Sequence, residues 1–330
     1  MTLVVQPIPP VPSRYRSLKL LGRGGFSAVY LARDEGLNRV VALKVMRGRY
    51  ETSAWARSRL LFEAEVTAGL EHPGVVPVYS RGDDDRGLAY FTMRYIQGET
   101  LEDALKGLHQ AVAASERTRL LRRLVDRLVD VCYTAAFAHE KGIIHRDLTP
   151  CNIMLGRHGE TLVVVWGLAR SLGQAGPDVG ASAAETAGWP ASARGLTGTR
   201  AGESVGTPRY MSPEQALGCW DQLGPATDVF GLGATLYHVL TGRPPFDDRD
   251  DRASTERARR GDCLAPRRLD RRIPAALETV CLKAMLRDPR DRYASTIALG
   301  DDLARWIAAE PLSVPRRSTL RAWDRQTTPK

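Results

Sequence analysis

The apolar positions of the chain follow strand-like patterns in its first third and helical patterns afterwards. Between about residues 15 and 95, short runs typical of strands dominate, interrupted by one helical stretch near 54–70. The runs are RSLKLLG, SAVYLAR, RVVALKVM, VVPVYS and LAYFTMRYI. They predict a small sheet accompanied by a single helix.

From Leu101 onward the pattern becomes helical. Residues 116–140 repeat apolar positions at i, i+3 and i+4 spacing, which predicts one long amphipathic helix. Two strand-like pieces, IML and TLVVVW, follow it. Further helices are predicted over 213–218, 226–241, 275–287 and 296–309. The pattern therefore predicts an α+β chain with a sheet-rich beginning and a mainly helical remainder.

Three segments lack such patterns. Residues 1–14 are rich in proline and read as a flexible leader. Residues 171–204 consist largely of Gly, Ala, Ser, Thr and Pro without sustained periodicity, and we expect a mobile insert there. Residues 312–330 form a short basic tail.

Composition excludes several classes of protein. The 330 residues are 43% apolar and 26% charged, which excludes disorder over most of the chain. No apolar run approaches the roughly 18 residues of a membrane span, and the N-terminus does not resemble a signal peptide, so we expect a cytoplasmic protein. The five cysteines lie far apart without a C-x-x-C pair, which argues against a disulfide framework or a zinc cluster.

The formal net charge of +9 raises the question of nucleic acid, but the basic residues are scattered among acids, which argues against such a partner. Only six of the 47 basic residues are lysine. A lysine retained inside an apolar run is therefore notable, because lysine and arginine are not interchangeable at a tight site.

Two neighbouring segments could bind phosphate. The glycine-rich segment from Leu21 to Tyr30 joins two predicted strands; it is either a tight turn or a loop whose amides approach phosphate oxygens. Fourteen residues later, Lys44 lies in the apolar run VALKV. This lysine either extends to solvent from an edge strand or directs its charge at the phosphates of a nucleotide.

The segment from His145 to Asn152 supplies an acid, Asp147, and a carboxamide, Asn152, after the long predicted helix. A carboxylate can accept the proton of a hydroxyl group, and an asparagine oxygen can bind a divalent cation. Together with the preceding segments, the chain resembles the eukaryotic-type serine/threonine protein kinases of the bacterial branch over about residues 15–310.

This resemblance implies an α+β, bilobal kinase fold with an N-lobe over 15–96, a C-lobe over 97–311 and a nucleotide cleft between them. It also implies ATP and Mg²⁺ as cofactors and a protein as substrate or partner, with neither nucleic acid nor a membrane span.

The resemblance assigns residues position by position. It makes residues 22–29 the glycine-rich loop, with Ser27 in place of the third glycine, Lys44 the phosphate-binding lysine and Glu63 its partner. Glu65 is the competing partner, but Glu63 shares a helical face with Thr67 and Leu70. The remaining nucleotide-binding residues implied are Leu21, Gly22, Gly24, Gly25, Phe26, Ser27, Val29, Ala42, Met93, Arg94, Ile96 and Met154.

Later motifs continue the resemblance. Residues 206–214 look like the end of an activation segment, where Thr207 indicates the serine/threonine class. Asp228 resembles the aspartate that holds the catalytic loop, and Arg292 resembles the partner of Glu214; both are implied to be structural. Because Arg146 precedes Asp147, control by phosphorylation within the insert is expected, with the acceptors Thr197, Thr199 and Ser204.

Two positions depart from the family pattern. Val165 stands where the family has a metal-binding aspartate, and a valine provides neither oxygen nor charge, which leaves Asn152 as the only implied Mg²⁺ ligand. Thr149 replaces a lysine that steadies the transferring phosphate. Two hypotheses follow: a protein serine/threonine kinase with impaired metal binding, with Asp147, Lys44 and Glu63 as catalytic residues, or a pseudokinase that acts as a nucleotide-responsive or purely scaffolding module.

Overall fold

The computed structural model describes residues 12–172 and 206–327. These residues form two compact units, each described here by itself. The first comprises residues 12–71 and 76–97, and the second comprises residues 72–75, 98–172 and 206–327.

The first unit is built on an antiparallel sheet with the strand order β1-β2-β3-β5-β4 within its described residues. The strands are β1 Tyr15–Arg23, β2 Ser27–Asp34, β3 Arg39–Met46, β4 Val78–Asp83 and β5 Ala89–Arg94. Between β3 and β4 lie the short 3₁₀ helix η1, Gly48–Tyr50, and the helix α1, Ala54–Gly69. The helix begins at Ser53, whose hydroxyl accepts a hydrogen bond from the backbone N–H of Ala56.

Strand alternation divides this unit into two apolar layers. On one face, alternate residues of β2 and β3 such as Tyr30 and Leu43 form one buried cluster. On the other face, Met46 and Phe91 pack with Leu60 of α1. Lys44 lies two residues before Met46, so the alternation places its side chain on the face that α1 covers.

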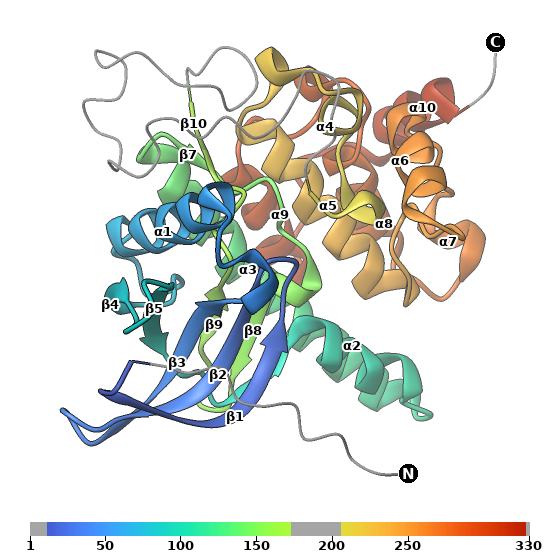
Figure 1. Cartoon of the computed structure of the whole chain (residues 1–330). Helices are drawn as coiled ribbons and strands as arrows, with labels where there is room; N and C mark the ends of the chain where they lie inside the picture. Colours follow the sequence, from blue (N-terminus) through green and yellow to red (C-terminus); the bar gives the residue numbers. More distant parts are fainter. Residues whose placement is uncertain (1–11, 173–205, 328–330) are drawn as a thin grey trace. The chain divides into compact units, whose positions relative to one another are not determined.

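The second unit is mainly helical in its described residues (Figure 1). Its α-helices are α2 Leu101–Gln110, α3 Ala114–Glu140, α4 Pro213–Leu217, α5 Pro225–Thr241, α6 Asp251–Arg260, α7 Pro266–Leu269, α8 Ala275–Ala284, α9 Thr296–Ala308 and α10 Arg316–Thr327. Its short strands are β6 Gly98–Thr100, β7 Ile143–Ile144, β8 Ile153–Gly156, β9 Thr161–Val163 and β10 Arg170–Ser171. Its 3₁₀ turns are η2 Pro150–Asn152, η4 Pro208–Tyr210, η5 Trp220–Gln222 and η6 Pro289–Asp291.

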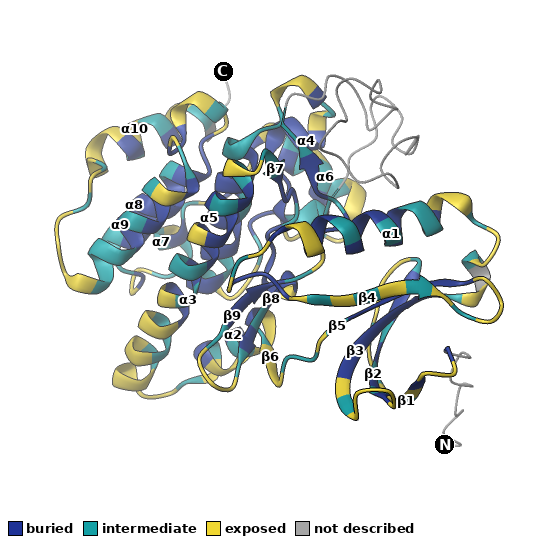
Figure 2. Cartoon of the chain, turned by 90° about the vertical axis from the view of Figure 1, so that its left-hand side faces the viewer, coloured by how far each residue is buried: buried dark blue, intermediate teal, exposed yellow. Residues whose placement is uncertain are grey.

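Helix α5 forms the centre of this unit and is buried along most of its length (Figure 2). Gly233 allows α5 to approach α8 closely, because a Cβ at this position would lie 2.7 Å from the Cβ of Ala284. Helix α3 is exposed in its first half and buried in its second half, which leads directly to β7 and the loop that carries Asp147. The helical core thus supports that loop.

The predicted fold class, α+β with a small antiparallel sheet and a mainly helical remainder, is confirmed. Helices α6, α7 and α10 were not expected, and α10 occupies most of the predicted basic tail. The predicted insert lies outside the described residues beyond its first two positions. The proposed domain boundaries and the cleft between the lobes stay predictions. No helix in the described ranges combines the length and apolar character that crossing a membrane requires.

Candidate active site

Asp147 lies in a loop whose backbone is fixed by Asp228. The backbone N–H groups of His145 and Arg146 each donate to one carboxylate oxygen of Asp228 at 2.8 Å, and His139 donates from Nε2 at 2.8 Å. Asp228 is fully buried; burial raises its pKa, but hydrogen bonds and charges from the two histidines outweigh this, and the net pKa is lowered. A buried ionised carboxylate therefore holds the loop in place.

The carboxylate of Asp147 accepts three hydrogen bonds. Thr207 donates its backbone N–H to Oδ1 at 3.0 Å and its hydroxyl to the same atom at 2.8 Å. Asn152 donates from Nδ2 to Oδ2 at 2.7 Å and to the backbone carbonyl of Asp147 at 2.8 Å. A carboxylate has about four lone-pair positions, so roughly one remains for another donor. Asp147 is thus held rigidly and keeps room for a hydroxyl proton.

The arrangement leaves the amide oxygen of Asn152 turned away from Asp147, because the amide nitrogen makes both bonds to that residue. Thr149, by contrast, is buried, and its hydroxyl lies 3.1 Å from the Sγ of Cys151. The hydroxyl of Thr149 is uncharged and already contacts Cys151, so it cannot neutralise a phosphate as a lysine would. The loop therefore offers one carboxylate and one amide oxygen but no cation at position 149.

Val165 has a φ of 65°, a left-handed conformation that β-branched residues rarely adopt. Its side chain is 38% exposed, so the isopropyl group is not required to fill the core. The following residue, Trp166, is fully buried and contacts His145 edge-on with ring centroids 4.6 Å apart. The buried Trp166 thus fixes the backbone next to position 165, whereas the exposed valine side chain contributes little packing.

The described residues do not fit a tightly held Mg²⁺ ion. An octahedral Mg²⁺ requires oxygen ligands. The amide of Asn152 can supply one oxygen, and the side chain of Val165 supplies none. In the described ranges, no group of three or more His, Cys, Asp or Glu side chains is arranged to hold a metal ion.

In the first unit, Lys44 and Glu63 form a buried ion pair. The Nζ of Lys44 lies 2.6 Å and 2.7 Å from the two carboxylate oxygens of Glu63. Lys44 is on β3, between β2 and β5, so it is not an edge-strand lysine that extends to solvent. Glu65 instead pairs with Arg81 on β4. The contact expected between Lys44 and Glu63 is present, and the competing glutamate has another partner.

The glycine-rich segment forms the turn between β1 and β2, closed by a hydrogen bond from the Gly24 N–H to the Ser27 carbonyl at 2.8 Å. A Cβ added at Gly22 or Gly25 would meet nothing within 4 Å, so folding alone does not require glycine at these positions. Open space beside these backbones suits the approach of a phosphate group.

Arg47, which sequence reasoning missed, donates to the carbonyl groups of Gly24 and Gly25 at 3.2 Å and 3.3 Å. Phe26 contacts Trp55 of α1 edge-on, with centroids 5.5 Å apart. The glycine-rich turn is therefore held by Arg47, the residue after β3, and by Trp55 of α1. No local motif in the sequence predicts either contact.

The other residues predicted to bind nucleotide occupy strands of both units. In the first unit, Ala42 is buried and pairs in register with Met93 across β3 and β5; Val29 is half-buried, and Leu21 is exposed. Residues 94 and 96 lie at and after the end of β5, the first exposed and the second half-buried. In the second unit, Met154 is half-buried on β8. Their common role in binding adenine stays a prediction.

Residues 206–214, which resemble the end of an activation segment, are fixed by buried polar contacts. Ser212 and Gln215 form a capping box at the start of α4, and Gln215 Nε2 donates to the carbonyl of Arg146 at 2.8 Å. Sequence reasoning missed both features. The sequence Ser-x-x-Gln is a recognisable signature of the capping box, whereas the bond to Arg146 has no local signal. Glu214 and Arg292 form a bidentate ion pair at 2.7 Å, as the resemblance implied. The segment is therefore anchored next to Asp147.

Arg146 itself is buried, with a φ of 68°. Its Nε donates to the carbonyl of Leu168, and its guanidinium carbon lies 5.9 Å from the ring of Trp220. The expected phosphorylation sites Thr197, Thr199 and Ser204 lie outside the described residues. Control through Arg146 stays a prediction.

Two comparisons with known proteins match most of this chain. A family model described as the protein kinase domain matches residues 15–302. The chain is 34% identical over 306 residues to serine/threonine-protein kinase PknB from Mycobacterium tuberculosis, covering 92% of this chain and 44% of that protein. It is 35% identical over 306 residues to serine/threonine-protein kinase PknD from Chlamydia trachomatis, covering 90% of this chain and 32% of that protein. The chain thus spans less than half the length of these relatives.

Proposed function

This chain belongs to the protein kinase family, and on that premise we propose that it is an ATP-dependent protein serine/threonine kinase whose phosphotransfer is slowed at the metal site. The observation that carries the proposal is the carboxylate of Asp147, which three hydrogen bonds orient while leaving about one lone-pair position open. A group oriented in this way is suited to act as a general base.

In the proposed reaction, a substrate serine or threonine hydroxyl gives its proton to Asp147. The hydroxyl oxygen then bonds to the γ-phosphorus of ATP, the bond from that phosphorus to the β–γ bridging oxygen breaks, and ADP leaves. Lys44, held by Glu63, is proposed to pair with the α- and β-phosphates, and the open backbone at Gly22 and Gly25 to admit the phosphate chain.

The slow rate is proposed to follow from two missing charges. Val165 offers no carboxylate, and Thr149 offers a buried hydroxyl in place of an ammonium group. Both losses affect charge that develops in the transition state, where removing one stabilising group costs on the order of 10²–10³ in rate. Phosphate groups of ATP would then bind with little help from a metal ion.

A second candidate function is a pseudokinase that binds nucleotide without transferring phosphate. The left-handed, exposed Val165 is the observation that favours it, because a strained conformation persists there although its side chain cannot bind metal. The retained ion pair of Lys44 and Glu63 favours nucleotide binding under either function.

Radiolabelled transfer from ATP distinguishes the two functions. We would measure ATP affinity and γ-phosphate transfer, to the protein itself and to a generic protein substrate, for the wild type and for Asp147→Asn. Slow transfer that disappears in Asp147→Asn supports the kinase. ATP binding without transfer that depends on Asp147 supports the second candidate, and failure of the wild type to bind ATP contradicts both.

A further inference from the structure

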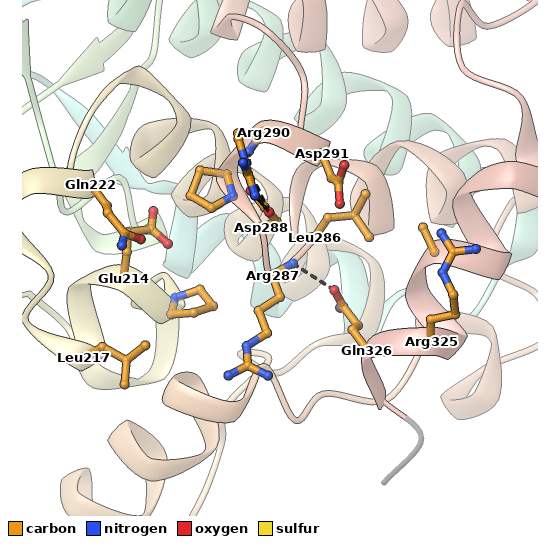
Figure 3. A pocket seen from close by; sticks show the side chains of 13 residues that line it. Glu214, Leu217, Gln222, Leu286, Arg287, Asp288, Arg290, Asp291, Arg325 and Gln326 are labelled. Carbon is orange, nitrogen blue, oxygen red and sulfur yellow. Dashed lines mark hydrogen bonds and ion pairs between the residues drawn. The ribbon is translucent and has the colours of Figure 1, made fainter. Parts of the chain in front are cut away.

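The second unit contains a pocket of about 840 Å³ that none of the residues assigned above to nucleotide or phosphate line. Leu217 and Gln222 lie on one side, Gln326 and Arg325 lie on the other, and Arg287 lies between them (Figure 3). Its volume is within the range of about 300–1,000 Å³ typical of ligand sites.

The charges that line this pocket do not balance. Glu214 is bonded to Arg292, and Asp288 is bonded to Arg290 at 2.6 Å, so these carboxylates are already paired. Neither Arg287 nor Arg325 has a carboxylate partner within the described part of the chain, whereas Asp291 is the lining carboxylate left unpaired there. Once the paired groups are set aside, the lining holds two guanidinium groups and one carboxylate, which leaves a local excess of positive charge.

The amide of Gln326 lies between the two arginines (Figure 3). Its Oε1 accepts a hydrogen bond from the backbone N–H of Arg287 at 2.8 Å, which fixes the orientation of the amide. The Nε2 atom is buried, and no acceptor for it is present in residues 12–172 or 206–327. Because Nε2 is buried, it does not itself contact a ligand in the pocket, and the groups available to an anion are the two arginines.

The opposite wall carries apolar side chains beside the polar Gln222. Leu217, at the end of α4, is 49% exposed, and Pro213 lies at the start of the same helix. The pocket therefore combines groups that bind oxyanions with a surface that binds an apolar side chain. These features come from three elements: α4, the loop after α8, and α10.

We propose that this pocket is a docking site for an acidic peptide segment of a protein partner. Carboxylates of the segment pair with Arg287 and Arg325, because a guanidinium binds a carboxylate through two parallel hydrogen bonds. An apolar side chain of the segment packs on Leu217. A ligand that engages all three elements has to carry anionic and apolar groups spaced along a chain, which a peptide does.

Arg325 and Gln326 on α10 lie beyond residues 15–302, the part matched by the family model. The proposal goes beyond phosphotransfer and holds whether or not the protein transfers phosphate.

The test measures fluorescence anisotropy of a labelled peptide of alternating glutamate and leucine, with a peptide in which glutamine replaces glutamate as comparison. The pocket variant is Arg287→Glu with Arg325→Glu. The matched control is Arg271→Glu with Arg321→Glu, which changes the net charge equally at exposed positions outside the pocket. This control is needed because a protein of net charge +9 attracts acidic peptides unspecifically.

We expect the pocket variant to bind the glutamate peptide at least about tenfold more weakly than the wild type, and the control to change affinity less than about twofold. A second variant, Arg287→Gln with Arg325→Gln, should weaken binding in the same direction, and circular dichroism verifies that each protein is folded. Equal affinity of the pocket variant and the control overturns the proposal. Equal binding of the glutamine peptide, or displacement of the peptide by citrate at equal concentration, also overturns it.

Discussion

Thr207 donates both its backbone N–H and its hydroxyl to the same atom, Oδ1 of Asp147, at 3.0 Å and 2.8 Å. Sixty residues separate the two in sequence. Because both bonds end on one oxygen, they restrict rotation of the carboxylate more than a single bond would. The backbone and side chain of Thr207 therefore set the orientation of the proposed general base.

Replacing Thr207 with valine should slow phosphotransfer without weakening ATP binding. The substitution keeps the shape of the side chain and the backbone N–H but removes one hydrogen bond to a charged group, worth about 1.5–3 kcal/mol. We expect a transfer rate lower by about tenfold to a hundredfold, measured with radiolabelled ATP. Thr207→Ser keeps the hydroxyl and should retain most of the rate; an equal loss in both variants would contradict this role.

Nucleotide binding should depend on Lys44 and Glu63 but not on Glu65. Lys44→Met removes the charge proposed to bind phosphate, and Glu63→Gln weakens its restraint. We expect the Kd for ATP to rise at least about tenfold in Lys44→Met, a change of about 1.4 kcal/mol, and by a smaller factor in Glu63→Gln. Glu65→Gln breaks the pair with Arg81, leaves Lys44 and Glu63 in place, and should leave the Kd unchanged. A comparable loss in Glu65→Gln would show that the assignment of Glu63 is wrong.

The buried pair of Glu214 and Arg292 should contribute strongly to stability. Both side chains are at most 2% exposed, and Arg292 also donates to the carbonyl groups of Leu286 and Ala226. Removing one partner leaves a buried charge, so Arg292→Leu should lower the free energy of unfolding by about 3–5 kcal/mol. Urea denaturation measures this. Arg290→Gln, which breaks an exposed pair in the same loop, should not move the midpoint.

Acid should destabilise the protein through His238. The Oη of Tyr210 lies 2.6 Å from the Nδ1 of His238, and burial lowers the pKa of this histidine to about 4, with a further lowering by the charge of His109. In the unfolded chain the pKa is about 6.5. Between these values the unfolded state binds one more proton, so stability falls as the pH drops from about 6.5 to 4, by up to about 3 kcal/mol.

The measurement is the free energy of unfolding in urea at pH 7 and pH 5. His238→Gln should reduce the loss of stability between these two values, whereas the exposed His158→Gln should keep it. An unchanged loss in His238→Gln would assign the acid sensitivity to other groups.

The elements predicted best are those with strong local patterns. Alternation of apolar residues predicted β2 and β3 to within about a residue, because each strand has one face in an apolar cluster. Lys44 could be singled out since it interrupts an apolar run in a lysine-poor chain. The family resemblance implied a glutamate partner for Lys44, and helical spacing favoured Glu63 over Glu65 because it places Glu63 and Thr67 on one buried face.

What could not be predicted depends on contacts that form only in the folded chain. Helix α6 is mostly charged and buries only Ser254 and Ala258, so it shows no apolar periodicity. Helix α10 lies in a basic segment and is anchored mainly by Trp323, a single apolar residue. The bonds from Thr207 to Asp147 and the contact of Arg47 with the glycine-rich turn join distant residues without a local signal.

The substitution Val165→Asp should be tolerated by the fold. A left-handed conformation costs an ordinary residue roughly 1–2 kcal/mol, while Asp and Asn adopt it more readily than a β-branched residue. The valine side chain is 38% exposed, so little packing is lost. The free energy of unfolding of Val165→Asp should therefore equal or exceed that of the wild type; marked destabilisation would indicate a packing role that its exposure does not suggest.

The measurement that tests the central claim most directly is the rate of radiolabelled phosphate transfer by the double variant Val165→Asp, Thr149→Lys, beside each single variant and the wild type. Each protein is paired with its Asp147→Asn form as a blank. Restoring the carboxylate and the cation should raise the rate at least about a hundredfold, above either single variant, and should make ATP binding depend on Mg²⁺. A wild type that transfers phosphate as fast as the double variant would contradict the account, because another group would then supply the missing charge.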